Sequence, residues 1–291
     1  HSVKIDDFLA IRDELAEVGI TTRSACGHTF RNILCCHQNG VCPKQPFDLY
    51  PWVQKIHNHI FERADVYNPR MPNRMNVSFS GCRDCSADAC INDIGFIAKK
   101  VREEDEEDKE TYGFELWAAG SLGKAPQFGQ KLKEFITFEE IIPALEAITE
   151  LHCSYGDHRN ALVKGRLKFL VAKWGFDKFR EEFEKLFAAF KAKQSPLPPE
   201  LAQPEVFGEV IPDDDLSLGE GVYLQRQEGF LRVQFWVPLG EISARQLRQV
   251  AELSRQFADG RAYHTTRQNF EFHWVKKETL DSLSACSSAL W

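Results

Sequence analysis

Apolar residues recur every three or four positions in several stretches of the chain, a spacing that predicts amphipathic helices. Asp6 and Asp7 mark the start of the first helix and Gly19 marks its end. Thr137 and Glu140 form a capping box ahead of the helix expected at 141–151. The expected helices cover residues 6–18, 52–60, 141–151, 162–171, 179–190 and 243–257.

Other stretches alternate apolar and polar residues, which predicts strands at 76–80, 91–98, 114–119, 231–237 and 270–274. Between the last helix of the first part and the later strands lies a proline-rich segment that cannot continue a helix. The sequence therefore predicts an α+β protein. A mixed sheet covered by helices occupies residues 1–194, a linker covers 195–214, and a small α+β unit covers 215–291.

Composition narrows the function classes. With 291 residues, of which 43% are hydrophobic, the chain can bury one or two sizeable cores. The formal net charge of -7 argues against nucleic acid as a partner but leaves room for a local basic pocket that binds small anions. The sequence contains no run of roughly eighteen apolar residues, the length that a membrane-spanning helix needs. The N-terminus has no signal-peptide pattern, so we expect a cytoplasmic location.

Cysteines are unevenly distributed. Of the nine cysteines, seven lie between residues 26 and 90. In a reducing compartment such clustering favours metal or cofactor chemistry over disulfides.

The motifs around these cysteines resemble the half-repeat of sirohaem-dependent nitrite and sulfite reductases. The resemblance rests on Cys26-Gly27-x-x-x-Arg31-Asn32, on Asn73-Arg74-Met75-Asn76, on the Ser80-Gly81-Cys82 loop and on the glycine loop from Ala119 to Gly129. Segments 223–229 and 265–269 resemble the ferredoxin-like half-domain of the same enzymes, truncated here. The family's complete enzyme has two units of each kind, so the resemblance implies that this chain is a fragment.

The resemblance implies roles for individual residues. Arg31 matches the arginine that faces the open side of the haem iron and grips substrate oxygens, a task suited to a planar guanidinium. Arg74 stands where the family has a catalytic lysine. At position 76, Asn76 resembles the residue of nitrite reductases more than that of sulfite reductases. Arg267 matches an arginine that binds sirohaem or substrate. The implied cofactor-binding residues are Arg23, Cys26, Gly27, Asn32, Gly120 and Gly123.

The resemblance also implies a 4Fe-4S cluster, which the family binds through Cys-x5-Cys and Cys-x3-Cys in its second sirohaem half. Cys36 and Cys42 have the first spacing, whereas Cys82 and Cys85 are one residue short and Ser86 occupies the expected place. These four cysteines can be the ligands if their loops meet. The alternatives are ligands in a second half outside this chain, idle buried thiols, or a zinc site, which the spacing disfavours.

The implied function is the six-electron reduction of nitrite to ammonia or of sulfite to sulfide, with nitrite slightly favoured by Asn76. Electrons would come from a ferredoxin or a flavoprotein and pass through the cluster to sirohaem. One alternative is an iron-sulfur oxidoreductase of the same fold without sirohaem. Another is a catalytically inactive structural half.

Overall fold

The first sheet has five strands in the order β1-β2-β3-β4-β5. The computed structural model describes residues 3–85, 87–102, 110–198, 201, 203–208 and 216–287. Strands β1, β2 and β3 pair in parallel, and β3, β4 and β5 pair antiparallel, so the sheet is mixed. Their bounds are β1 (Leu34–Cys35), β2 (Val77–Ser80), β3 (Ile94–Arg102), β4 (Glu110–Ala118) and β5 (Gln130–Ile136).

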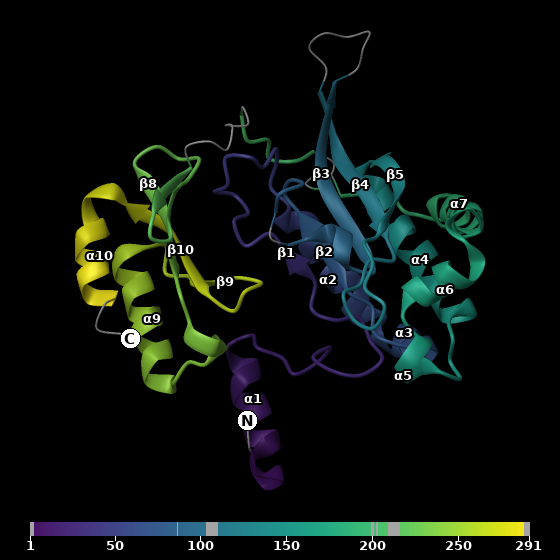
Figure 1. Cartoon of the computed structure of the whole chain (residues 1–291), viewed down its shortest axis with the longest axis horizontal. Helices are drawn as coiled ribbons and strands as arrows, with labels where there is room; N and C mark the ends of the chain where they lie inside the picture. The colour runs from purple at the N-terminus through teal and green to yellow at the C-terminus, as the bar shows by residue number, and fades with distance from the viewer. Residues whose placement is uncertain are drawn as a thin grey trace.

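Helices cover one face of this sheet (Figure 1). Phe114 of β4 lies at the centre of the core, with its ring edge-on to those of Phe47, Phe79 and Phe138. The predicted capping box of Thr137 and Glu140 is confirmed and starts the helical segment that carries α4. The helices are α2 (Tyr50–Glu62), α3 (Ala64–Tyr67), α4 (Ile141–Tyr155), α5 (Ala161–Lys164), α6 (Leu167–Trp174) and α7 (Phe176–Lys191).

A second, antiparallel sheet has the order β6-β7-β8-β10-β9 and its own hydrophobic core. Its strands are β6 (Ser217–Gly219), β7 (Val222–Leu224), β8 (Phe230–Phe235), β9 (Tyr263–His264) and β10 (Phe270–Lys276). Two helices, α9 (Ala244–Phe257) and α10 (Leu280–Ser287), lie on one side of it (Figure 1). Ser243 caps α9 by accepting a hydrogen bond from the Gln246 backbone, as the sequence predicts.

The predicted α+β class is confirmed, with a mixed sheet and helices in the first unit. Short strands β1, β6, β7 and β9, and strand β5, were not predicted, because their hydrophobic alternation is brief or broken. The first predicted helix exists as α1 (Phe8–Glu17), yet it buries none of its residues and projects away from both sheets (Figure 1). The boundaries at 194 and 215 stay a prediction. Among the described residues, no helix combines the length and apolar character that crossing a bilayer requires.

Segment 203–208, within the predicted linker, returns to the first unit. Val206 pairs antiparallel with Phe47, and the Asp48 backbone donates to the Glu205 carbonyl at 3.0 Å. The chain is thus fixed to the first sheet shortly before the second unit begins.

Truncating Phe114 to alanine is expected to lower the free energy of unfolding by about 3 to 5 kcal/mol, because a fully buried ring leaves a cavity among its aromatic neighbours. Urea unfolding followed by circular dichroism measures the change. Phe128→Ala is the matched control, since its side chain is 73% exposed, and we expect it to change stability by less than about 0.5 kcal/mol. Equal losses in the two variants would contradict this description of the core.

Candidate functional site

The two cysteine pairs follow neighbouring parallel strands. Cys36 follows β1, and Cys82 lies just beyond β2, so both loops leave the sheet at the same edge. The Cys36 backbone donates to the Phe79 carbonyl at 3.0 Å, which continues the pairing to the start of the first loop. Cys36, Cys42, Cys82 and Cys85 all line one cavity of about 340 Å³. The structure therefore brings the four predicted cysteines together.

Electrostatics within this cysteine cavity confirm how close the thiols are. A hydrogen bond from Cys36 lowers the pKa of Cys85 to about 6, helped by backbone N–H groups of Gly81 and Ala87. Burial, followed by the charge of Cys85, raises the pKa of Cys82 to about 11. Cys85 is thus the thiol most ready to lose its proton and bind a cation.

The second unit forms the opposite wall of the cysteine cavity. Glu271 of β10 is fully buried there, and its carboxylate accepts from Arg232 at 3.3 Å and from His273 at 2.9 Å. Burial raises the pKa of Glu271, but hydrogen bonds from His273 and His37 and the charge of Arg232 bring it well below its ordinary value. Burial raises the pKa of Cys42, and the Lys44 backbone N–H and the charge of Arg232 offset this rise only in part. The wall therefore places positive charge beside the thiols.

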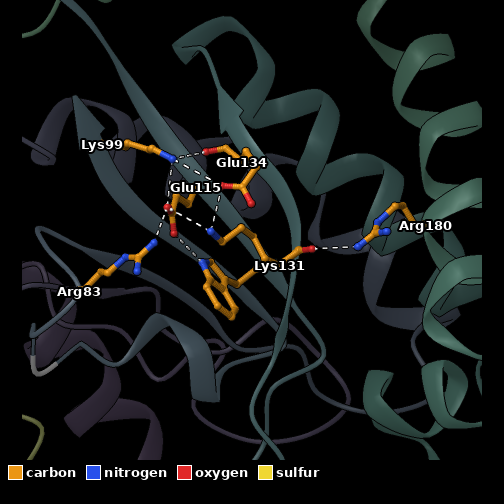
Figure 2. Close-up of polar contacts among 7 residues, drawn as sticks. Arg83, Lys99, Glu115, Lys131, Glu134 and Arg180 are labelled. Carbon is orange, nitrogen blue, oxygen red and sulfur yellow. Dashed lines mark hydrogen bonds and ion pairs between the residues drawn. The ribbon is translucent and has the colours of Figure 1, made fainter. Parts of the chain in front are cut away.

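A buried carboxylate on β4 anchors the second cysteine loop (Figure 2). Arg83, between Cys82 and Cys85, donates to Glu115 at 2.9 Å. The same carboxylate accepts from Lys99 at 3.2 Å and from Lys131 at 3.4 Å. Burial raises the pKa of Glu115, but these donors bring it down to about 2.

A second cavity, of about 300 Å³, includes three of the predicted site residues, but neither Arg31 nor Arg267 lines it. It is lined by Arg74, Asn76 and Gly123 together with Arg166 and Thr266. Thr266 comes from the second unit. This cavity and the cysteine cavity therefore both lie where the two units meet.

A fully buried aspartate organises the anion cavity. Asp93 accepts from the Asn76 backbone at 2.8 Å and binds the Arg166 guanidinium in bidentate fashion, at 2.7 and 3.2 Å. The side-chain oxygen of Asn76 is buried and has no hydrogen-bond partner within the described part of the chain. A buried acceptor without a donor is costly, so a bound group that donates there fits the site.

Arg31 and Arg74 lie on adjacent segments, because the Arg31 backbone donates to the Met75 carbonyl at 2.9 Å. Burial, followed by the charges of Arg166 and Arg31, lowers the pKa of Arg74. The Arg31 guanidinium donates to the carbonyls of Ala25 and Gly27. Three cations thus share one region, which favours an anion between them.

The remaining predicted residues have less defined positions. Arg23, Cys26, Asn32, Gly123 and Arg267 are exposed, and among them only Gly123 lines the anion cavity. Gly27 has a positive φ of 93°. Their cofactor-binding and catalytic roles stay predictions.

Gly120 has a structural reason to be glycine, because an added Cβ would lie 2.3 Å from the Cys90 carbonyl oxygen. The cofactor-binding role that the family resemblance implies for Gly120 stays a prediction.

Sequence reasoning missed the buried partners of the site. No sequence pattern around Arg166 indicates its salt bridge with Asp93. Glu115 and Glu271 each sit in an alternating strand pattern, where a single acidic residue is typical of a solvent-facing position. Only the three-dimensional pairing shows that they are buried and bound to cations.

No group of three or more His, Cys, Asp or Glu side chains in the described residues is arranged around a single metal ion. An iron-sulfur cluster has a different requirement, because each cysteine binds a different iron and the sulfurs are spread around the cluster.

Comparisons with known proteins agree with this fold. Residues 26–189 match the family described as "Nitrite and sulphite reductase 4Fe-4S domain". Residues 223–285 match the "Nitrite/Sulfite reductase ferredoxin-like half domain". The chain belongs to the nitrite and sulfite reductase family.

Two curated relatives show how the chain relates to the family. It is 28% identical to the assimilatory ferredoxin-dependent nitrite reductase of Haloferax mediterranei, covering 98% of this chain and 48% of that protein. It is 27% identical to sulfite reductase [ferredoxin] 1 of Mycolicibacterium paratuberculosis, covering 100% and 48% respectively. The chain thus spans about half the length of the curated relatives it matches.

A solved structure shows the same fold. The structure of the Mycobacterium tuberculosis NirA protein superposes with a TM-score of 0.76 at 24% identity, covering 99% of this chain and 48% of that one.

Replacing Glu115 with glutamine is expected to destabilise the protein in a pH-dependent way. The pKa of Glu115 is lowered from 4.5 to about 2, so its ionised form stabilises the fold above about pH 4.5, and this contribution is lost as the pH falls toward 2. The stability gap between wild type and E115Q should therefore be full at about pH 7 and shrink below pH 4.5. Urea unfolding at several pH values measures it.

Glu134→Gln is the matched control, because the Glu134 side chain is 75% exposed and its contacts with Lys99 and Lys131 are at the surface. We expect a much smaller gap for E134Q. A gap for E115Q that stays constant across the pH range would show that its carboxylate charge does not hold the cations.

Proposed function

We propose that this chain provides a sirohaem-binding and cluster-binding half of an enzyme that reduces nitrite to ammonia or sulfite to sulfide by six electrons. The observation that carries the proposal is the convergence of Cys36, Cys42, Cys82 and Cys85 on one cavity. Membership of the family supports it, since the matched domain is described as a 4Fe-4S domain.

The cysteine cavity fits a 4Fe-4S cluster. It offers four thiols as ligands, a Cys85 whose pKa lies near 6, and the cation Arg232 near the site of negative charge. Bound there, the cluster supplies one-electron transfer. The chain's own residues hold the thiols in place and limit the access of water. We favour this ligand role over the alternative of buried thiols that bind nothing, because the two cysteine pairs line the same cavity.

The anion cavity fits sirohaem and an oxyanion substrate. Arg74 and Arg166 present guanidinium groups that can pair with carboxylates of the macrocycle or with oxygens of the substrate, and Arg31 lies beside them. The buried side-chain oxygen of Asn76 needs a donor, which an oxyanion is not, and a water bound beside the substrate is proposed to donate to it. Sirohaem supplies the metal to which the substrate binds. Arg267 is proposed to join the site through its neighbour Thr266, which lines the cavity.

Arg74 in place of lysine shapes how protons reach the substrate. A guanidinium donates hydrogen bonds but does not release its proton at working pH, so Arg74 is proposed to hold and orient the oxyanion. Proton delivery then falls to water held in the cavity.

The electron donor and compartment complete the proposal. The names of the relatives specify ferredoxin as donor, and they include both nitrite and sulfite reductases. We propose a ferredoxin-type donor and a cytoplasmic enzyme. Asn76, which resembles the residue of nitrite reductases, favours nitrite as the substrate.

Anaerobic purification from cells that make sirohaem should yield a coloured protein with about five iron, one of them in sirohaem, and about four sulfide per chain. Cys85→Ser is expected to lose most of both, because Cys85 provides the most acidic of the four thiols. Cys153→Ser is the matched control, since Cys153 is equally buried but lies in α4 outside the cavity. Iron and acid-labile sulfide assays with the visible spectrum measure the result.

The alternatives give different outcomes. Iron and sulfide without chlorin-like absorption would support an iron-sulfur oxidoreductase without sirohaem. A colourless wild-type protein with neither would overturn the proposal and support an inactive half. If C85S and C153S lower the iron content equally, the four cysteines are not the ligands.

With sirohaem bound, Arg74→Ala should weaken binding of sulfite or nitrite by about 10 to 100 fold, because a charge-assisted hydrogen bond contributes about 1.5 to 3 kcal/mol. Ligand titration followed in the visible spectrum gives the dissociation constant. Arg245→Ala, which removes an exposed arginine on α9, is the control and should leave the constant unchanged. Unchanged affinity in R74A would exclude Arg74 from the anion site.

A further inference from the structure

We propose that Arg226 of the second unit is a positioning residue that holds the Cys36–Cys42 loop in the shape the cluster needs. The inference rests on the proposed cluster and assigns a role to a residue that touches none of the reacting groups. It would make stable cluster binding depend on contact between the two units.

The Arg226 guanidinium spans a row of backbone carbonyls at the end of the cysteine loop. One terminal nitrogen donates to the carbonyls of Cys42 at 3.3 Å, Pro43 at 2.9 Å and Gln45 at 2.7 Å. The other donates to the Phe207 carbonyl at 2.9 Å. A single side chain therefore ties the segment that carries Cys42 to segment 203–208.

Two further hydrogen bonds from the second unit reach main-chain carbonyls of the same loop. The Arg226 backbone donates to the Val41 carbonyl at 2.8 Å, and the Gln227 side chain donates to the Gly40 carbonyl at 3.0 Å. The carbonyls of residues 40 to 43 and of residue 45 thus accept hydrogen bonds from donors of the second unit. The thiols of Cys36 and Cys42 remain in the cysteine cavity.

The arrangement requires arginine in particular. The two terminal nitrogens reach carbonyls on two separate segments, which the planar fork of a guanidinium can do and a lysine ammonium, as a single point charge, cannot do equally well. The Arg226 guanidinium stacks 5.2 Å from the centre of the Phe207 ring, which fixes its plane.

The Arg226 guanidinium is also partly buried beside Cys42. Burial lowers the pKa of Arg226, and the charge of Cys42 acts in the opposite direction. The guanidinium is therefore partly desolvated and close to a cluster ligand. Residues that orient metal ligands in this way typically change metal affinity by about 10 to 100 fold when they are replaced.

The test compares Arg226→Gln, Arg226→Lys and the control Arg255→Gln, which removes an exposed arginine on α9. Each protein is loaded anaerobically with iron and sulfide. The rate of cluster loss to an iron chelator is measured with the midpoint potential and the electron paramagnetic resonance spectrum. We expect R226Q to lose its cluster about 10 to 100 fold faster than wild type, with a shifted potential and spectrum. R226K should fall between them, and R255Q should match wild type.

Several outcomes separate the possible explanations. A wild-type chain that takes up no cluster would overturn the proposed function itself. Suppose instead that the wild-type chain takes up a cluster, and that R226Q has the same rate of cluster loss, midpoint potential and spectrum. That result would overturn only this inference.

Faster loss with an unchanged potential and spectrum would show that Arg226 merely stabilises the fold, and this too would overturn a positioning role. Thermal unfolding of the metal-free variants provides the comparison of fold stability. If R226Q does not fold, R226K, which keeps the charge and most of the stem, decides the question through the same readouts.

Discussion

The parallel pairing of β1 with β2 is the contact on which the candidate site depends. Leu34 pairs with Ser78 and Cys35 with Phe79, so the loops that follow the two strands begin side by side. A shift of this register by one residue would turn every side chain to the opposite face and separate the cysteine pairs. The core beneath, where the rings of Phe79 and Phe114 meet edge-on, holds this register in place.

Three buried carboxylates then place the cations. Glu115 holds Arg83 in the second cysteine loop, Asp93 holds Arg166 in the anion cavity, and Glu271 holds Arg232 in the wall of the cysteine cavity. A buried carboxylate is stable only when donors surround it, so each one fixes the position of its arginine. Arg232 and Arg166 therefore line the two cavities of an acidic protein, whereas Arg83 is exposed and ties the second cysteine loop to β4.

The sequence allowed most of the fold to be predicted, because the long helices and the central strands have clear periodicity. The family resemblance also predicted the candidate ligands Cys36, Cys42, Cys82 and Cys85. Their meeting could not be derived, because β1 has only two residues and no detectable alternation.

The partners of the candidate site could not be predicted either. Arg226 lies in a polar stretch typical of a solvated loop, and its partners are backbone carbonyls, which no sequence pattern identifies. The sequence pattern predicts that Glu115 and Glu271 are exposed, whereas both are buried. The pattern fails because burial of a charge depends on donors from distant segments.

The division of the cysteine cavity between two units has a consequence for biosynthesis. The ribosome makes all four cysteines before it makes residues 216–287, which contribute the opposite wall. During that interval the thiols face solvent on a nascent chain, where iron delivery is unobstructed but oxidants are equally free to reach them. The order of translation thus sets a period in which the thiols are open on one side, and folding of the C-terminal unit then adds the opposite wall.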